Sequence, residues 1–594
     1  MTTEQIGVFV VLLFALVLFV TERWRYDIVA LLALLAVTLA GIVPADRAFL
    51  GFGHAAVITV AAVLVIGRAL QNSGLVDLLA NWVLKVGDRV TLQVTALTGV
   101  VAALSAFMNN VGALALLLPI AIRMARKNGH PPSMLLMPLS FGSLLGGMTT
   151  LIGTPPNIII ASFRAQTDFG PFRMFDFTPV GITVALAGIL FMSLIGWRLI
   201  PQRKGQLSPE ELFRIEDYVA EVRVPEDSKL AGKFVREVEE TVESDITVVG
   251  LGRGERKLLA PSSYERLQTG DVLIVEADSE ALKTFLDATK LELIGDEKEQ
   301  GNDKGLGSDE VSVIEAIVKP NSPLEGNTAW TFNLRWRYGI NLLGVARQGT
   351  RLKQRLKSIQ FQAGDILLLQ GPRERLQEAL SVVGCLPLAE RGLHFGPQRL
   401  ALSLTIFTVS IAAAAGGFLA APIALAGAAV LMVLFKLISL REAYDSIDWP
   451  IIVLLGAMLP LGAAMETTGA ADLVANGLLK ISGQLPPLAT LIIIFLGVMF
   501  LSDIINNAAA AVLMAPIAMS VAQGMGASPD PFLMAVAVGA SSAFLTPIGH
   551  QSNTLVMGPG GYKFSDYARM GFPLEVIIVL VAVPLILWFW PLGV

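Results

Sequence analysis

The sequence predicts a polytopic α-helical membrane protein with two five-span halves in an inverted repeat, a re-entrant hairpin in each half, and two small cytoplasmic α+β domains inserted between the halves. Of the 594 residues, 54% are hydrophobic and 16% are charged, whereas soluble chains carry about a quarter charged residues. Long charged stretches are confined to residues 202–397, and the flanking segments repeat each other's motifs. We therefore expect domains at 1–204, 207–297, 308–393 and 396–594.

The flanks contain apolar runs long enough to span a bilayer. They lie near 5–22, 27–44, 54–71, 132–165 (interrupted) and 177–200, and again near 398–416, 421–438, 449–466, 531–558 and 571–592. The first run lacks a preceding basic region and a small-residue cleavage site, so we expect a retained span. A longer segment precedes the fourth run of each half, at about 90–124 and 485–523, with an Asn-Asn pair near its middle. We expect a re-entrant hairpin with this pair at its tip.

The two halves are predicted to be copies of one unit. Asn109 and Asn506 are 397 residues apart, and Gly153 and Gly549 are 396 apart. Around these residues, FMNNVGALALLLPIA matches INNAAAAVLMAPIAM, and IGTPPN matches IGHQSN.

The charge distribution predicts opposite orientations for the two halves, because cytoplasmic loops are enriched in Lys and Arg. With the N-terminus outside, the outside loops near 417–420 and 523–530 carry neither residue, and the inside loops carry several, among them Arg23, Arg25, Lys85, Arg89, Arg123, Arg126, Lys127, Lys436, Arg441, Lys563 and Arg569. Five spans per half is an odd number, so the second half is upside down. The two hairpin tips can then meet near the midplane, as in secondary transporters.

The inserted segment is itself doubled. Ser228 and Gly232 correspond to Ser322 and Gly326, and GDVLIVEA corresponds to GDILLLQG, each 94 residues later. Short apolar runs with Gly-Asp turns predict an α+β module in each copy, with a linker at 298–309. The charge rule places both modules in the cytoplasm.

The repeated polar motifs predict a cation site. Pro155 and Pro156 cannot continue a helix, and irregular backbone at membrane depth is tolerated where it lines a cavity. The freed carbonyls near Gly153 and Gly549 and the amide oxygens of the Asn pairs are neutral ligands suited to Na⁺. Ser105 and Ser502 precede Asn109 and Asn506 by four residues, which places each serine on the same helix face. The expected sodium ligands are Ser105, Asn109, Asn110, Gly153, Ser502, Asn506, Asn507 and Gly549.

The same motifs predict an anion site, because helix N-termini offer N–H groups and positive dipole ends. The residues expected to line it are Asn109, Asn110, Thr154, Pro155, Asn506, Asn507, His550, Gln551 and Ser552. Asp503 is the acid in the second hairpin and a candidate coupling residue.

Each of these features has a structural alternative. Asn pairs also join helices in membranes, and Ser105 and Ser502 can bond back to the preceding turn. Asp503 can cap or pair structurally, and His550 can be a neutral lining residue rather than a pH sensor. Recurrence in both halves, beside a broken helix, favours a binding site.

The motifs resemble the divalent anion/sodium symporter family, which carries dicarboxylates, citrate or sulfate. LTPIGHQSNTLVMGPGGYKFSDYARMG resembles its sulfate-permease-like branch, in which two TrkA-C (RCK-C) domains lie between the halves. The resemblance implies an elevator mechanism and a homodimer. The family's Ser-Asn-Thr tip stands here as Asn109-Asn110-Val111 and Asn506-Asn507-Ala508, and His550-Gln551-Ser552 replaces Thr-Pro-Pro. A dicarboxylate pocket is therefore less expected than a sulfate pocket.

We therefore expect an inner-membrane symporter of a small inorganic or organic dianion, sulfate first, coupled to Na⁺. The rivals are a dicarboxylate symporter, a sodium/proton antiporter using Asp503, and a membrane sensor. The motifs indicate neither an enzyme nor a catalytic cofactor nor a nucleic-acid partner. The inserted domains either bind a nucleotide or other small ligand, or serve as packing modules. The lone Cys385 excludes an internal disulfide framework.

Overall fold

The computed structural model describes the chain except for a set of gaps. The gaps among the helices are 22–23, 76–77, 80–82, 84, 166, 168–169, 483–484 and 594, and those in the inserted segment are 202–218, 241–246, 254–255, 260, 262–263, 277–284, 286–288, 294–310, 321, 333, 339, 348–349, 353–355, 357–358, 373–375, 377–378, 381 and 389–396. The predicted linker at 298–309 lies outside the described residues. The chain forms two compact units, one comprising Met1–Gln202, Gly392–Val556 and Lys563–Val594, the other Arg203–Arg391 and Met557–Tyr562.

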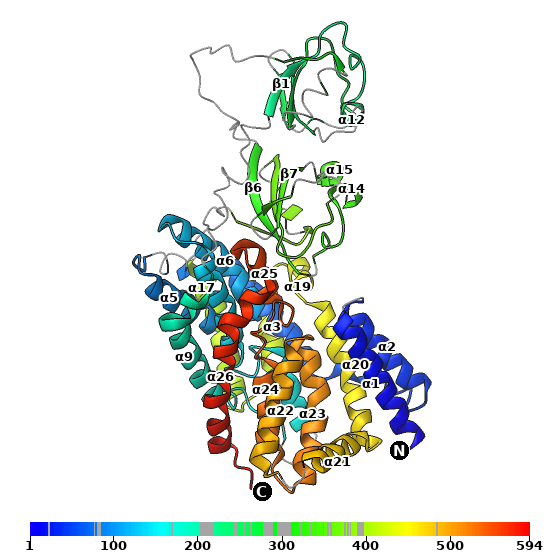
Figure 1. Ribbon diagram of the computed structural model, residues 1–594, viewed down its shortest axis with the longest axis vertical. Helices are drawn as coiled ribbons and strands as arrows, with labels where there is room; N and C mark the ends of the chain where they lie inside the picture. The colour runs from blue at the N-terminus through cyan, green and yellow to red at the C-terminus, as the bar shows by residue number, and fades with distance from the viewer. Residues whose placement is uncertain are drawn as a thin grey trace. The chain divides into compact units, whose positions relative to one another are not determined.

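The first unit is helical (Figure 1). Its N-terminal part contains α1 (Thr3–Thr21), α2 (Tyr26–Leu39), α3 (Ala55–Asn72), α5 (Val90–Ser105), α6 (Asn110–Lys127), α7 (Ser133–Gly147), α8 (Pro155–Arg164), α9 (Thr178–Phe191) and α10 (Trp197–Leu199). Its C-terminal part contains α17 (Pro397–Ala415), α18 (Ala421–Leu434), α19 (Leu440–Asp445), α20 (Trp449–Thr467), α21 (Ala470–Ser482), α22 (Pro487–Ser502), α23 (Asn507–Gly524), α24 (Pro529–Ala540), α25 (Gln551–Gly560) and α26 (Phe564–Phe589).

Among the described residues, six helices are long and apolar enough to cross a membrane: Ala55–Asn72, Thr178–Leu199, Gln398–Ala415, Trp449–Thr467, Asn507–Gly524 and Phe564–Phe589. Several predicted spans appear instead as shorter apolar helices, including α1, α2 and α18. A π-turn at Met192–Gly196 interrupts the predicted span at 177–200. This insertion of one extra residue per turn is compatible with a continuous helix axis.

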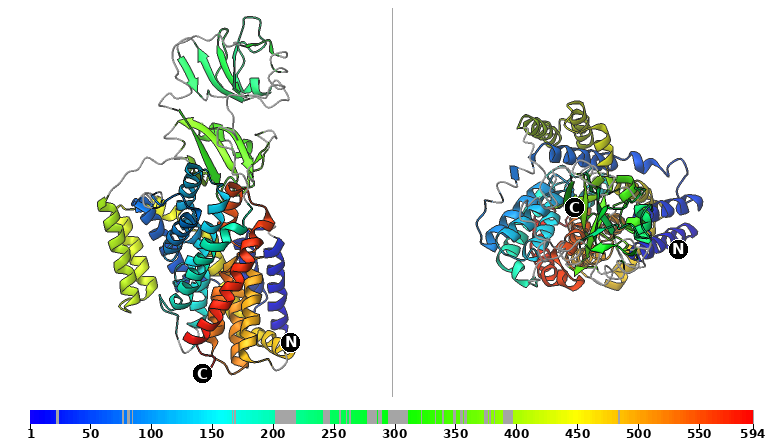
Figure 2. Two further views of the ribbon diagram at one scale, coloured as in Figure 1. Left: turned by 60° about the vertical axis from the view of Figure 1, so that its left-hand side comes forward. Right: turned by 90° about the horizontal axis from the view of Figure 1, so that it is seen from above.

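Helices of the N-terminal half pack against helices of the C-terminal half. Helix α2 packs on α20, and α3 packs on α18; α9 packs on α26. Figure 2 shows α1 and α2, in blue, standing beside the yellow and orange helices of the C-terminal half. Within each half, the hairpin helices pack on the helix that follows them, α5 and α6 on α7, and α22 and α23 on α24. The core of the unit therefore consists of the hairpins and the broken helices.

The second unit contains two five-stranded antiparallel sheets. The first has the order β3-β2-β4-β1-β5, with β1 (Val219–Arg223), β2 (Thr247–Arg253), β3 (Arg256–Leu259), β4 (Val272–Glu276) and β5 (Glu292–Leu293). The second has the order β10-β6-β9-β7-β8, with β6 (Val311–Val318), β7 (Asn341–Arg347), β8 (Thr350–Arg351), β9 (Ile366–Pro372) and β10 (Cys385–Pro387). Read in reverse, the second order matches the first, with strands β6 to β10 corresponding to strands β1 to β5.

Each sheet contains a matching ion pair between a half-buried arginine and a buried aspartate. Arg253 binds Asp271 through two nitrogens at 2.9 and 2.8 Å, and Arg347 binds Asp365 at 2.8 and 2.8 Å. The carboxylate in each pair raises the pKa of the arginine. Bidentate geometry of this kind fixes the strand β2 or β7 onto the turn that precedes β4 or β9.

Candidate functional site

The hairpin tips have the same backbone in both halves. α5 ends at Ser105 and α6 begins at Asn110, while α22 ends at Ser502 and α23 begins at Asn507. The intervening Asn109 and Asn506 are N-cap residues with φ/ψ of −60/137° and −57/136°. Their side-chain oxygens accept from Val111 N at 3.1 Å and Ala508 N at 2.9 Å. Asparagine favours this position because its oxygen satisfies an otherwise unpaired N–H.

The broken helices are held by a second matched set of contacts. Asn157 donates to Thr150 O at 2.8 Å and Gly147 O at 3.5 Å, seven and ten residues earlier. Asn553 donates to Thr546 O at 3.1 Å and Ala543 O at 2.8 Å, again seven and ten residues earlier. Each amide therefore spans a break and satisfies carbonyls that the missing helical turn leaves free.

Each break is also tied to its hairpin tip. The Thr150 hydroxyl donates to Ala106 O, and the Thr546 hydroxyl donates to Asp503 O. Glycine is required where the two segments meet. A Cβ on Gly153 would lie 2.9 Å from Ser105 O, and one on Gly549 would lie 2.7 Å from Ser502 O.

An oxygen cluster surrounds one end of the Asn110 amide. That end lies 2.6 Å from Ser105 Oγ, 3.2 Å from Ser143 O and 3.2 Å from Gly153 O, and we call these three atoms the oxygen cluster. Asn110 is 2% exposed and Ser105 is fully buried. If the amide nitrogen occupies this end, it donates to the cluster. If the amide oxygen occupies it, the Ser105 hydroxyl donates to this oxygen, and the carbonyl oxygens of Ser143 and Gly153 face it with no proton between them, an arrangement that a bound cation would stabilise.

The other end of the Asn110 amide reaches the opposite half of the chain. It lies 3.4 Å from His550 Nε2. His550 Nδ1 accepts from Ser552 N at 3.0 Å, so a neutral imidazole here carries its proton on Nε2. The predicted residues Ser105, Asn110, Gly153, His550 and Ser552 are thus brought together. Ser143, which the sequence analysis missed, completes the cluster and also approaches Ser552 Oγ at 3.3 Å.

Several buried polar atoms near the tips and breaks have no hydrogen-bond partner among the described residues. They include the Thr154 hydroxyl and the Asn507 side-chain nitrogen. Thr154 is the N-cap of α8 and Asn507 is the first residue of α23, and these two helices pack against each other. Burial without a hydrogen bond costs free energy, so these donors are available to a polar ligand.

The remaining predicted residues lie at the same tips but outside the oxygen cluster. The Ser502 hydroxyl donates to Ala540 O at 2.5 Å instead of approaching Asn507. Pro155 begins α8 and Gln551 begins α25, and both are half-buried. Among the described residues, neither Ser105 nor Ser502 donates to a carbonyl of the preceding turn. The structure therefore does not show the back-bonding that was the structural alternative for these two serines.

Asp503 lies beside a second acid that the sequence analysis missed. Asp503 Oδ1 accepts from Leu545 N at 2.9 Å and Glu575 Oε1 accepts from Phe544 N at 3.4 Å. The backbone N–H groups of the neighbouring residues Phe544 and Leu545 thus hold the carboxyl groups of Glu575 and Asp503 close to each other. The signal was available, because Glu575 lies inside a predicted span and an intramembrane acid is a functional candidate by default.

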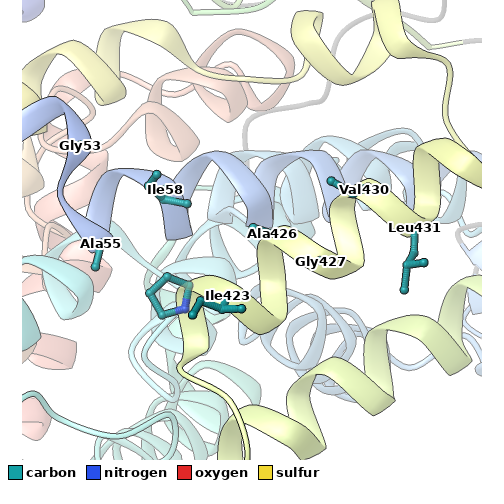
Figure 3. Close-up of a pocket in the computed structure, with 9 residues that line it drawn as sticks. Gly53, Ala55, Ile58, Ile423, Ala426, Gly427, Val430 and Leu431 are labelled. Atoms are coloured by element: carbon teal, nitrogen blue, oxygen red, sulfur yellow. The ribbon is translucent and has the colours of Figure 1, made fainter.

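Arg164 is half-buried and is already paired with a carboxylate. Arg164 binds both oxygens of Asp530 at 2.7 and 2.8 Å, joining the end of α8 to the start of α24. This pair neutralises the arginine. Another feature, an apolar groove of about 760 Å³ between α3 and α18, is lined by residues such as Ile58, Ile423 and Val430 (Figure 3). Its lining offers no polar side chain for an ion.

Comparison with known proteins identifies the kind of molecule that carries this site. The sequence pattern of the family described as citrate transporter (CitMHS) matches residues 16–539. The chain belongs to the citrate transporter family. This membership, with the apolar helices described above, indicates a membrane transporter rather than an enzyme.

Related transporters are known from several organisms. An uncharacterized transporter of Synechocystis sp. is 34% identical over 590 residues, covering 97% of this chain and 95% of that protein. An uncharacterized transporter of Escherichia coli is 32% identical over 613 residues, covering 100% of both. Sodium/sulfate cotransporter 2 of Chlamydomonas reinhardtii is 27% identical over 358 residues, covering 57% of this chain and 40% of that protein.

Proposed function

We propose that this member of the citrate transporter family is a sodium-coupled symporter of a small divalent anion, with sulfate the first candidate. The observation that carries the proposal is the oxygen cluster around Asn110. Uncharged oxygens from a hairpin tip, a helix and a broken helix meet there in a buried place. Such a set suits Na⁺, which prefers hard oxygen ligands, and the site needs no acid.

The anion site in this proposal uses the unpaired donors. Thr154 supplies a hydroxyl and Asn507 an amide nitrogen that have no partner among the described residues, and both lie at helix N-termini. The repeat relates Asn507 to Asn110 and Thr154 to His550, and Asn110 and His550 contact each other. Helix dipoles and neutral donors favour a compact oxyanion. Arg164 is already paired with Asp530, so the site lacks the bidentate clamp that a carboxylate prefers. The sodium/sulfate cotransporter among the relatives supports the same choice.

The architecture in this proposal is an inverted repeat that works as an elevator. The matched tip and break contacts support two copies of one unit, and the exchanged packing of α2 on α20 and α3 on α18 supports a two-fold relation. We further propose an inner-membrane location, a homodimer and cytoplasmic TrkA-C domains. Deleting residues 207–393 tests these domains: loss of assembly favours a structural role, and an altered rate with intact dimers favours ligand-dependent regulation.

Uptake of labelled sulfate into proteoliposomes, with and without an inward sodium gradient, tests the function. We expect uptake to require sodium and to resist excess citrate. Asn110→Ala and Asn507→Ala are expected to abolish it in folded protein, whereas Asn72→Ala, which removes an exposed contact to Glu442, keeps it. Citrate uptake in place of sulfate uptake would favour the dicarboxylate symporter, and sodium-driven proton movement alone would favour an antiporter that uses Asp503.

A further inference from the structure

The Asn110 amide joins two sites that demand opposite orientations of it. One end faces the oxygen cluster, and the other faces His550 Nε2 at 3.4 Å. Without a cation, the favourable arrangement turns Nδ2 toward the cluster, where it donates to oxygens, and turns Oδ1 toward the Nε2–H of His550. The amide N–H groups and the Nε2–H of His550 then each face an acceptor.

A cation in the oxygen cluster reverses this preference. Na⁺ requires the amide oxygen on its own side, so Nδ2 must point to His550. The Nε2–H of His550 then meets a second donor. Its tautomer cannot adjust without losing the bond in which Nδ1 accepts from Ser552 N at 3.0 Å. Two buried donors are left without an acceptor, which costs free energy until an acceptor arrives.

We infer that the Asn110 amide is a two-position switch, and that His550 converts sodium binding into an anion-binding site by presenting its Nε2–H and the Asn110 amide N–H to the anion. This inference rests on the proposed function and predicts that the anion binds after sodium. Sodium and anion share no charged ligand in this arrangement. Their binding is coupled because turning the Asn110 amide changes which of its atoms faces the sodium and which faces the anion.

Two features of the structure favour a discrete switch over a gradual movement. The backbone of the tip is fixed, because Asn109 caps α6 and Thr150 ties Ala106 to the broken helix. The backbone of Gly147 also packs closely against the amide, because a Cβ there would lie 2.4 Å from its Oδ1. Rotation of the terminal amide by half a turn is therefore the movement that the site permits.

Histidine NMR of the full-length protein in nanodiscs tests the switch directly. The chain has 4 histidines, so the His550 Nε2–H signal can be assigned by its loss in His550→Ala, with His130→Ala as a control at a loop position. We expect Na⁺ alone to shift this signal, K⁺ alone to leave it unchanged, and sulfate added with Na⁺ to shift it again.

Binding measurements give an independent readout. In the wild type we expect Na⁺ to raise sulfate affinity by about tenfold, in the range usual for coupled sites. In His550→Ala this dependence is expected to fall below about twofold, with sodium-induced thermal stabilisation retained. Asn110→Asp, which has oxygen at both ends, should bind Na⁺ without shifting the His550 signal.

The failures of the switch and of the function are distinguishable. If Na⁺ stabilises the protein and drives sulfate uptake while the His550 signal stays unchanged, the switch is wrong and the symporter proposal stands. If Na⁺ neither stabilises the protein nor supports uptake, the proposed function is wrong, and the switch fails with it.

Discussion

The first hairpin, α5–α6, and the second, α22–α23, share a backbone and differ in what their side chains build. Both tips have an asparagine cap, a threonine tie and an asparagine that spans the neighbouring break. At the first tip, Ser105 and Asn110 face each other at 2.6 Å. At the second, the Ser502 hydroxyl turns away to Ala540 O, and a carboxyl group stands where the first tip has Ala106. One scaffold therefore holds two different polar centres.

The residue beside each tip explains part of this difference. Gly147, whose carbonyl accepts from Asn157, leaves room for the Asn110 amide. Ala543 accepts from Asn553 in the same way, so it occupies the matching position with a methyl group. We therefore propose the first tip, rather than the second, as the cation site. The predicted sodium ligands of the second half, Ser502, Asn506, Asn507 and Gly549, remain a prediction.

The largest effect is expected from Gly147→Ala. Its methyl would lie 2.4 Å from Asn110 Oδ1, so the amide must shift out of the oxygen cluster. Overpacking of this kind costs about 1–3 kcal/mol, and a loss of that size in sodium binding corresponds to about 5- to 150-fold in affinity. The measurement is the sodium concentration that gives half-maximal sulfate uptake.

Gly99→Ala is the matched control, because the added methyl on α5 meets nothing within 4 Å. Its sodium dependence is expected to equal that of the wild type. Unchanged sodium dependence in Gly147→Ala would show that the cation binds elsewhere and would remove the contrast between the two tips.

Removing the asparagines that span the breaks is expected to have a smaller effect on sodium dependence and to lower the stability of the fold instead. Asn157→Ala and Asn553→Ala each leave buried carbonyls unpaired, and we expect each to lower the free energy of unfolding by about 2–3 kcal/mol. Asn553 also accepts from Ser140 Oγ at 2.8 Å, so its loss should cost about 1 kcal/mol more. Thermal unfolding in detergent measures both. A much larger effect for Asn157 would contradict the equivalence of the two breaks.

Much of this arrangement was predictable from local sequence. The apolar runs gave the helices, and Gly153-Thr-Pro-Pro gave the first break, because proline cannot donate within a helix. The predicted hairpin at 90–124 corresponds to α5 and α6 at Val90–Lys127. Asn109 was predicted as a ligand, whereas its oxygen caps α6, a role that its place before a helix also favours.

The contacts that define the candidate site were not predictable from one sequence. Ser143 contributes a backbone carbonyl, which carries no residue-specific signal. The Asn110–His550 contact joins positions 440 residues apart, and its register depends on how α6 meets α25. Glu575 differs from these two, because its charge within a span is visible in the sequence and only its partner Asp503 required the structure.

The caps offer a milder test. Asn109→Ala and Asn506→Ala each remove one cap bond, and we expect a loss of about 1 kcal/mol in the free energy of unfolding. Asn109→Ser and Asn506→Ser retain a capping oxygen and should restore most of it. If the serine variants regain stability but not sulfate uptake, these residues contact the anion as well. Full recovery of uptake would limit them to capping.

The smallest effect is expected from Ala543→Gly, which opens the second tip to match the first. Added backbone freedom should cost about 0.5–1 kcal/mol of stability, seen as a small drop in melting temperature. Sodium dependence is expected to stay the same, because the Ser502 hydroxyl remains bound to Ala540 O and so does not supply the oxygen that Ser105 supplies to Asn110. A steeper sodium dependence of uptake in this variant would mean that the methyl group alone separates the two tips, and that the second tip is a latent cation site.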